Sequence, residues 1–115
     1  MNVKVVYLGS IRQKVGIKEE KLNLADGLSI ADLLSKIVAL HATLKDIIRI
    51  EDESLVDPSF VVLLNGLSIN LTDVKSTKLK DGDTVTLMTP ISGGDAFKSK
   101  LGFKSHYFYF KINVE

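Results

Sequence analysis

The stretch Ser29-Ile30-Ala31-Asp32-Leu33-Leu34-Ser35-Lys36-Ile37-Val38 predicts an amphipathic helix. Its large apolar residues return at spacings of three, one, three and one, so they share one face of the helix. Ser29 occupies the N-cap position, and Asp32 three residues later gives a pattern that resembles a capping box. Leu40 extends the same apolar stripe. We therefore expect one main helix whose apolar face packs on a second layer.

Strand patterns lie on both sides of this helix. Before it we expect strands over 2–8 and 17–24, paired antiparallel and joined by one helical turn from Ile11 to Val15. After it we expect a second helix or an extension over 42–50, an acidic loop over 51–57, and strands over 60–64, 67–71 and 84–89. Asn65-Gly66 is a strong hairpin signal because both residues accept positive φ. The order predicts an α+β fold, a β-grasp (ubiquitin-like) roll with a mixed sheet of four to five strands.

Composition excludes several classes of function. The chain has 115 residues, of which 45% are hydrophobic and 25% charged, as in a globular domain. There is no cysteine, which excludes thiolate metal sites and a cysteine nucleophile within the chain. The net charge of +1 gives no basic excess for nucleic acid, and no apolar run approaches the ~20 residues of a membrane span. Two histidines, His41 and His106, predict no metal site, and the absence of a signal-peptide pattern favours the cytoplasm.

A strand, a proline and two glycines follow one another before the composition changes. Residues 79–94 read Leu-Lys-Asp-Gly-Asp-Thr-Val-Thr-Leu-Met-Thr-Pro-Ile-Ser-Gly-Gly. Two glycines carry no side chains, so such a backbone can thread a narrow channel in another protein. If Gly94 were the last residue, its unhindered α-carboxylate could be converted by ATP to an acyl-adenylate. A flexible hinge is the other interpretation of the same two residues.

The composition changes after Gly94. Six of the eight aromatic residues lie within 95–115, and this part carries a net charge of +2 against −1 for the rest. We therefore expect a domain over 1–94 and a C-terminal extension over 95–115. Near its end, Phe108, Phe110, Ile112 and Val114 alternate with polar or tyrosine residues and would share one strand face. The extension fits a pro-segment removed by a protease, a permanent part that adds a strand or covers an apolar patch, or a segment that binds a partner or a membrane.

Three stretches carry a resemblance to a known family. They are Val3 to Arg12, Glu19 to Leu34, and Val61 to Gly66 together with Leu79 to Gly94. The most specific pattern is Leu-x-Asp-Gly-Asp-x-Val about ten residues before Gly-Gly. Residues 1–94 resemble the MoaD/ThiS-like sulfur carriers among the ubiquitin-like β-grasp proteins, and most of all the small subunit of molybdopterin synthase. Ubiquitin-related modifiers and archaeal small modifiers are relatives.

The resemblance implies a carrier and not a catalyst. Gly94 would carry the adenylate and then the thiocarboxylate, for molybdenum cofactor synthesis. The flexible segment that enters partners would consist of Thr89, Pro90, Ile91, Ser92 and Gly93. An adenylating (E1-like) enzyme would use ATP, the large subunit of molybdopterin synthase would receive the sulfur, and the carrier itself would hold no cofactor tightly. No nucleic acid and no membrane are expected as partners.

Two features depart from the family pattern. Thr89-Pro90 stands where two prolines are usual, and Asp95 follows Gly94 where the family's chain usually ends. With Asp95 attached, the Gly94 carbonyl belongs to an amide and cannot be adenylated, so we expect that a protease must first cut after Gly94. Two alternatives stay open: a ubiquitin-like modifier conjugated through Gly94 to target lysines, and a non-activated β-grasp binding module whose tail is permanent.

Overall fold

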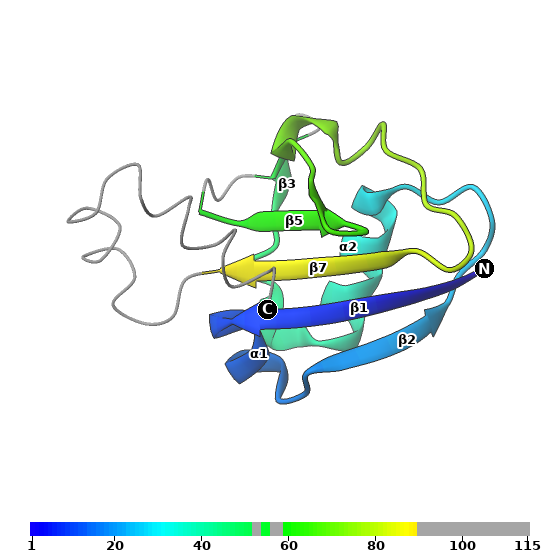
Figure 1. The fold of residues 1–115 in the computed structure, drawn as a ribbon. Helices are drawn as coiled ribbons and strands as arrows, with labels where there is room; N and C mark the ends of the chain where they lie inside the picture. The colour runs from blue at the N-terminus through cyan, green and yellow to red at the C-terminus, as the bar shows by residue number, and fades with distance from the viewer. Residues whose placement is uncertain (52–53, 56–58, 90–115) are drawn as a thin grey trace.

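The computed structural model describes residues 1–51, 54–55 and 59–89. Within them, five strands form one sheet in the order β2-β1-β7-β5-β6, and α2 lies across one face of it (Figure 1). The elements are β1 Asn2–Gly9, α1 Ser10–Val15, β2 Glu19–Asn23, α2 Ile30–Leu40, the 3-10 turn η1 Ala42–Leu44, β3 Ile50–Glu51, β4 Ser54–Leu55, β5 Val61–Leu64, β6 Leu67–Ser68, the 3-10 turn η2 Leu71–Asp73 and β7 Thr84–Thr89. The predicted α+β class, the mixed sheet and the single main helix are confirmed.

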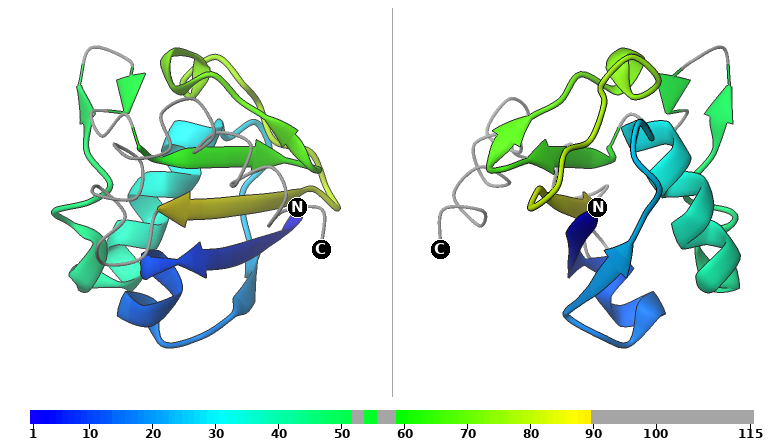
Figure 2. Two further views of the ribbon diagram at one scale, coloured as in Figure 1. Left: turned by 60° about the vertical axis from the view of Figure 1, so that its left-hand side comes forward. Right: turned by 90° about the vertical axis from the view of Figure 1, so that its right-hand side faces the viewer.

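The last strand, β7, occupies the centre of the sheet. It runs parallel to β1 and antiparallel to β5, while β1 and β2 pair antiparallel as predicted. A parallel pair needs a crossover connection, and the segment that contains α2 supplies it. In the β1–β7 ladder Tyr7 lies opposite Leu87, and Gly9 lies opposite Thr89. The end of the first strand and the end of the last strand therefore lie side by side, as Figures 1 and 2 show.

The predicted cap and apolar face of α2 are both present. The Ser29 hydroxyl accepts from the Asp32 backbone N–H at 3.2 Å, and the Asp32 carboxylate accepts from the Ser29 N–H at 2.9 Å. These bonds complete a capping box, and the hydrogen bonds from Ser29 lower the pKa of Asp32. The helix buries Ile30, Ala31, Leu33, Leu34 and Ile37. They pack against a core that also contains Val3, Val5 and Tyr7 of β1, Val62 of β5, and Val85 and Leu87 of β7.

The second helix or extension expected over 42–50 is much shorter than predicted, because only its first three residues are helical. The chain forms one 3-10 turn at η1, and His41 ends α2 with φ −129° and ψ 85°, outside the helical region. Leu44 and Ile48 are buried in the core, so their apolar spacing reflects packing and not a continued helix. The acidic loop expected over 51–57 is also corrected in part, because Ile50 pairs with Leu55 and Glu51 with Ser54 in a two-stranded ribbon.

The hairpin at Asn65-Gly66 is confirmed, but its return strand is shorter than predicted. Asn65 has φ 51° and Gly66 has φ 85°, which places both residues in the left-handed region that this turn requires. The return strand was expected over 67–71, whereas β6 is two residues long. The Asn70 side chain accepts from the Thr72 N–H at 3.1 Å and starts η2 instead. This cap competes locally with strand pairing.

Candidate functional site

The candidate site is the end of β7, where the predicted carrier segment leaves the sheet. Thr89 is the last residue that the structure describes. Pro90, Ile91, Ser92, Gly93 and Gly94 lie outside the described residues, as does the extension over 95–115. The proposed domain boundary at Gly94 lies outside them too. The structure therefore defines the point from which the carrier segment starts.

Thr89 is held firmly in the sheet. It is 5% exposed, pairs with Gly9 in the β1–β7 ladder, and its hydroxyl forms a hydrogen bond with the hydroxyl of Ser10. The sequence placed Thr89 first in the flexible segment, but the structure makes it the last residue of a central strand. The anchored part of the chain thus extends through Thr89.

Gly9 is the residue that allows this close approach. Its backbone has φ 67° and ψ −142°, a conformation that only glycine adopts readily. A Cβ atom built at position 9 would lie 1.9 Å from the Thr89 carbonyl oxygen, far inside any real contact. α1 begins directly after Gly9, with Ile11 in the core and Arg12 Nε donating to the Tyr7 carbonyl at 2.9 Å. The turn after β1 therefore packs closely against the end of β7 and holds Thr89 in place.

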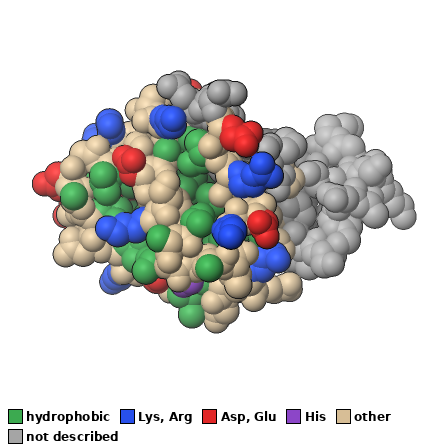
Figure 3. Space-filling model, turned by 180° about the vertical axis from the view of Figure 1, so that it is seen from behind, with side chains coloured by type: hydrophobic (Ala, Val, Ile, Leu, Met, Phe, Trp, Pro, Cys, Tyr) green, Lys and Arg blue, Asp and Glu red, His purple; other side chains and the backbone are tan. Residues whose placement is uncertain are grey.

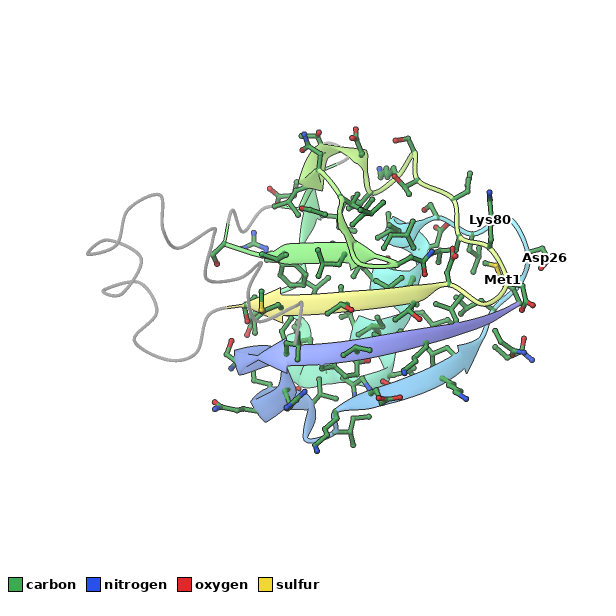
Figure 4. The ribbon with its side chains drawn as sticks, viewed as in Figure 1. Met1, Asp26 and Lys80 are labelled. Atoms are coloured by element: carbon green, nitrogen blue, oxygen red, sulfur yellow. The ribbon has the colours of Figure 1, made fainter. Side chains whose placement is uncertain are left out.

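The Asp81-Gly82-Asp83 pattern fixes the other end of β7. The Asp81 carboxylate accepts from the Asn2 N–H at 2.7 Å. The Asp83 carboxylate accepts from the Lys80 N–H at 2.7 Å and from the side-chain amide of Asn65 at 2.9 Å. These aspartates flank a turn at Gly82, and they join β7 to β1 and to the β5–β6 hairpin. Figure 4 shows Met1, Asp26 and Lys80 at this end of the sheet, away from the end of β7.

A polar cluster that the sequence analysis missed joins β1, β2 and the end of α2. The Tyr7 hydroxyl donates to Glu20 Oε2 at 2.5 Å, and His41 Nε2 lies 2.6 Å from the same oxygen. The Tyr7 and His41 rings meet edge to face with their centroids 5.9 Å apart. The pKa of Tyr7 is raised, mainly by burial and to a smaller extent by the hydrogen bond to Glu20. Burial opposes ionisation of Glu20, but hydrogen bonds from Tyr7 and His41 lower its pKa overall.

The contacts of Tyr7, Glu20 and His41 hold neighbouring elements of the fold together. His41 is the C-cap of α2, and its contact with Glu20 ties the helix end to β2. Within residues 1–51, 54–55 and 59–89, no three acidic or histidine side chains gather in a way that could hold a metal ion. In the same part of the chain, no helix is long and apolar enough to cross a membrane. The side shown in Figure 3 intersperses acidic and basic side chains, so no single sign of charge dominates it.

The geometry defines a class of protein: a small β-grasp domain whose last strand is central and seated against the turn after its first strand. Comparison with known families gives the same answer. The model of the ThiS family matches residues 5–94, and the chain belongs to that family. Its members are sulfur carriers and small ubiquitin-like modifiers, and the carriers are not catalysts themselves. The family match ends at the second glycine, Gly94.

Individual relatives agree with this assignment. The molybdopterin synthase sulfur carrier subunit of Chlamydomonas reinhardtii is 33% identical over 94 residues, which are 82% of this chain and all of the relative. Small archaeal modifier protein 3 of Haloferax volcanii is 29% identical over the same shares of both chains. The solution structure of the Haloferax volcanii HVO 2177 protein has a TM-score of 0.69 and 29% identity, and the match covers 81% of this chain and 86% of that one. The predicted β-grasp fold is confirmed.

Proposed function

We propose that the protein is the sulfur carrier of molybdopterin synthesis, charged on the carboxyl group of Gly94. The observation that carries this proposal is the family match, which ends at Gly94, five residues after the anchored Thr89. Five extended residues span at most about 17 Å, enough to take a terminal carboxylate from the sheet into the active site of a partner. The likeness to the Chlamydomonas sulfur carrier subunit supports molybdopterin synthesis as the pathway.

The chemistry proceeds in three steps, each of them catalysed by a partner. A protease first hydrolyses the peptide bond between Gly94 and Asp95, which leaves residues 1–94 as the carrier and releases the extension 95–115. An adenylating (E1-like) enzyme then uses ATP: the Gly94 carboxylate attacks the α-phosphate and pyrophosphate leaves. Sulfide, or sulfur carried on a thiol of the partner and released by a reductant, displaces AMP and gives the thiocarboxylate. The chain supplies only the carboxylate, so no cysteine, metal or tightly held cofactor is required of it.

The large subunit of molybdopterin synthase is the proposed receiver of the sulfur. The segment Pro90 to Gly93 would enter both partners in turn, and we place the whole sequence of steps in the cytoplasm. Neither nucleic acid nor a membrane takes part. Because Thr89 is fixed against Gly9 and Ser10, partner binding need not order the chain up to Thr89.

A protein modifier is the second candidate. The likeness to small archaeal modifier protein 3 favours it, because a modifier of this family uses the same terminal carboxyl group. In this case the activated Gly94 would form an isopeptide bond to a lysine of a target protein. The two functions share the adenylation step and differ in the acceptor. A thiocarboxylate consumed by the large synthase subunit supports the carrier, and lysine conjugates in cells support the modifier.

The decisive experiment compares the full chain with a chain ending at Gly94. Both are incubated with ATP and the adenylating enzyme of the same cells, and the products are identified by intact mass. We expect an adenylate only on the shorter chain, and with a sulfur source a species heavier by the difference between sulfur and oxygen. A shorter chain with Gly94 deleted is the matched control, and it should fold but remain uncharged. Charging of the full chain, or none on the chain ending at Gly94, would contradict the proposal.

A further inference from the structure

The sheet face opposite α2 carries an apolar patch. Strand residues alternate between faces, and Val5, Tyr7, Val62 and Leu87 belong to the core. Their neighbours therefore point to the other side. We call these neighbours the outer patch: Val6 and Leu8 of β1, Val61 and Leu63 of β5, and Met88 of β7. Met88 lies between Leu8 and Val61 in the strand register, so the patch is continuous across the three central strands.

Two residues of the outer patch are almost fully buried. Met88 is 2% exposed and Leu63 is 5% exposed, although neither belongs to the core cluster under α2. In a two-layer fold the second face of the sheet is open, and side chains there are flanked by neighbours but not covered by them. Figures 1 and 2 place α2 on the other side of the sheet. Val6, Leu8 and Val61 of the same patch remain partly exposed, so the outer face offers apolar surface on which a further segment can dock.

We propose that the C-terminal extension of this same chain docks on the outer patch, through the strand-like stretch 107–114. The chain leaves the sheet at Thr89, the residue after Met88. The 17 residues from 90 to 106 can span up to about 58 Å, whereas β7 is about 20 Å long. The stretch 107–114 can therefore return along the face from which the chain departs.

The sequence of the extension matches an apolar, one-sided surface. Phe108, Phe110, Ile112 and Val114 would all lie on one face of a strand, against the outer patch. Tyr107, Tyr109, Lys111 and Asn113 would face solvent. Aromatic rings over aliphatic side chains bury large areas, which favours docking within one chain, where no translational entropy is lost. While it is attached, the extension both blocks the Gly94 carboxyl group and masks the outer patch; cleavage after Gly94 would release both.

Oxidation of Met88 tests the docking directly. The chain has two methionines, Met1 and Met88, so hydrogen peroxide followed by peptide mapping reports on each separately. In the full chain, Phe108→Ala with Phe110→Ala should speed oxidation of Met88 at least about tenfold, which corresponds to about 1.4 kcal/mol of docking free energy. The matched control, Tyr107→Ala with Tyr109→Ala, changes the opposite strand face and should keep the wild-type rate.

Three results would overturn the proposal. The first is an equal rate of Met88 oxidation in the wild type and in the Phe108/Phe110 variant. The second is the same acceleration in the tyrosine control. The third is protection that weakens on dilution, which would assign the cover to a second copy of the chain.

As a second measurement, the Met88 methyl group should show nuclear Overhauser contacts to phenylalanine rings in the full chain, and their absence would also refute docking. The assay contains neither ATP nor a partner, so its outcome is separate from charging at Gly94.

Discussion

Gly9→Ala should destabilise the protein much more than Gly16→Ala, although both glycines have positive φ. Gly16 has φ 85° at the C-cap of α1, and an added Cβ there meets no atom within 4 Å. At Gly9 the added Cβ would lie 1.9 Å from the Thr89 carbonyl oxygen. The pair of variants therefore separates the cost of a left-handed backbone from the cost of displacing the end of β7.

The expected magnitudes follow from these two geometries. Alanine in the left-handed conformation of Gly16 costs about 1–2 kcal/mol. At Gly9 the backbone conformation alone costs about 1–3 kcal/mol. The clash must then be relieved by moving Thr89, which sacrifices its hydrogen bond with Ser10 and a ladder bond at about 1 kcal/mol each. We expect a total loss of about 3–5 kcal/mol for Gly9→Ala, a large part of the ~5–15 kcal/mol that stabilises a typical domain.

Urea denaturation of the full chain measures both losses. The sequence has no tryptophan, so far-ultraviolet circular dichroism is the suitable signal. Equal losses for the two variants, with unchanged slopes, would refute the idea that the Gly9–Thr89 contact requires glycine. A larger loss for Gly9→Ala with early hydrogen exchange confined to the end of β7 would support it.

Three further predictions concern the rest of the domain. The folded pKa of Glu20 lies below its ordinary value of 4.5, so its carboxylate stabilises the fold above that pH, and this contribution is lost as pH falls through the folded pKa. Glu20→Gln should therefore lower stability near pH 7 and lose less stability than the wild type on acidification. Melting temperatures of both proteins between about pH 3 and pH 7 check this sign, and parallel curves would contradict it. Ser29→Ala removes one half of the capping box and should cost about 1 kcal/mol in urea, whereas no loss would mean that the cap is redundant. Leu67→Ala, at a side chain that is 72% exposed, should change stability by less than about 0.5 kcal/mol, and Leu87→Ala, in the core, should cost about 2–5 kcal/mol; similar losses would contradict the difference in burial between the two side chains.

Local patterns predicted the elements that local physics determines. The cap at Ser29 and the apolar stripe after it located α2 because both signals depend on residues within one or two helical turns. Asn65-Gly66 located the hairpin because its turn requires positive φ at both positions. The Gly-Gly at 93–94 and the pattern before β7 gave the family, and the family match bears this out.

Contacts between distant parts of the chain could not be predicted in the same way. Position 9 must be glycine because of its contact with Thr89, a residue that is close in space but lies at the other end of the described sequence. Glu20 has a polar sequence context, yet in the fold it receives hydrogen bonds from β1 and from the end of α2. Leu44 and Ile48 have the spacing of a helix face, but both are apolar because they are buried in the core by contacts with distant parts of the chain.

The contact between Gly9 and Thr89 should also affect KM for the adenylation of Gly94. Ordering one residue of backbone costs about 1–2 kcal/mol, so a strand that frayed over its last two residues would add about 2–4 kcal/mol to the cost of entering a partner's active site. In a chain ending at Gly94, Gly9→Ala should therefore raise KM for the adenylating enzyme and leave kcat nearly unchanged, because the reacting carboxyl group is the same. Gly16→Ala, which leaves Thr89 in place, should show the wild-type KM at a temperature where both variants are folded. A Gly9→Ala carrier that is folded and charged with the wild-type KM would show that the partner does not depend on the anchored end of β7.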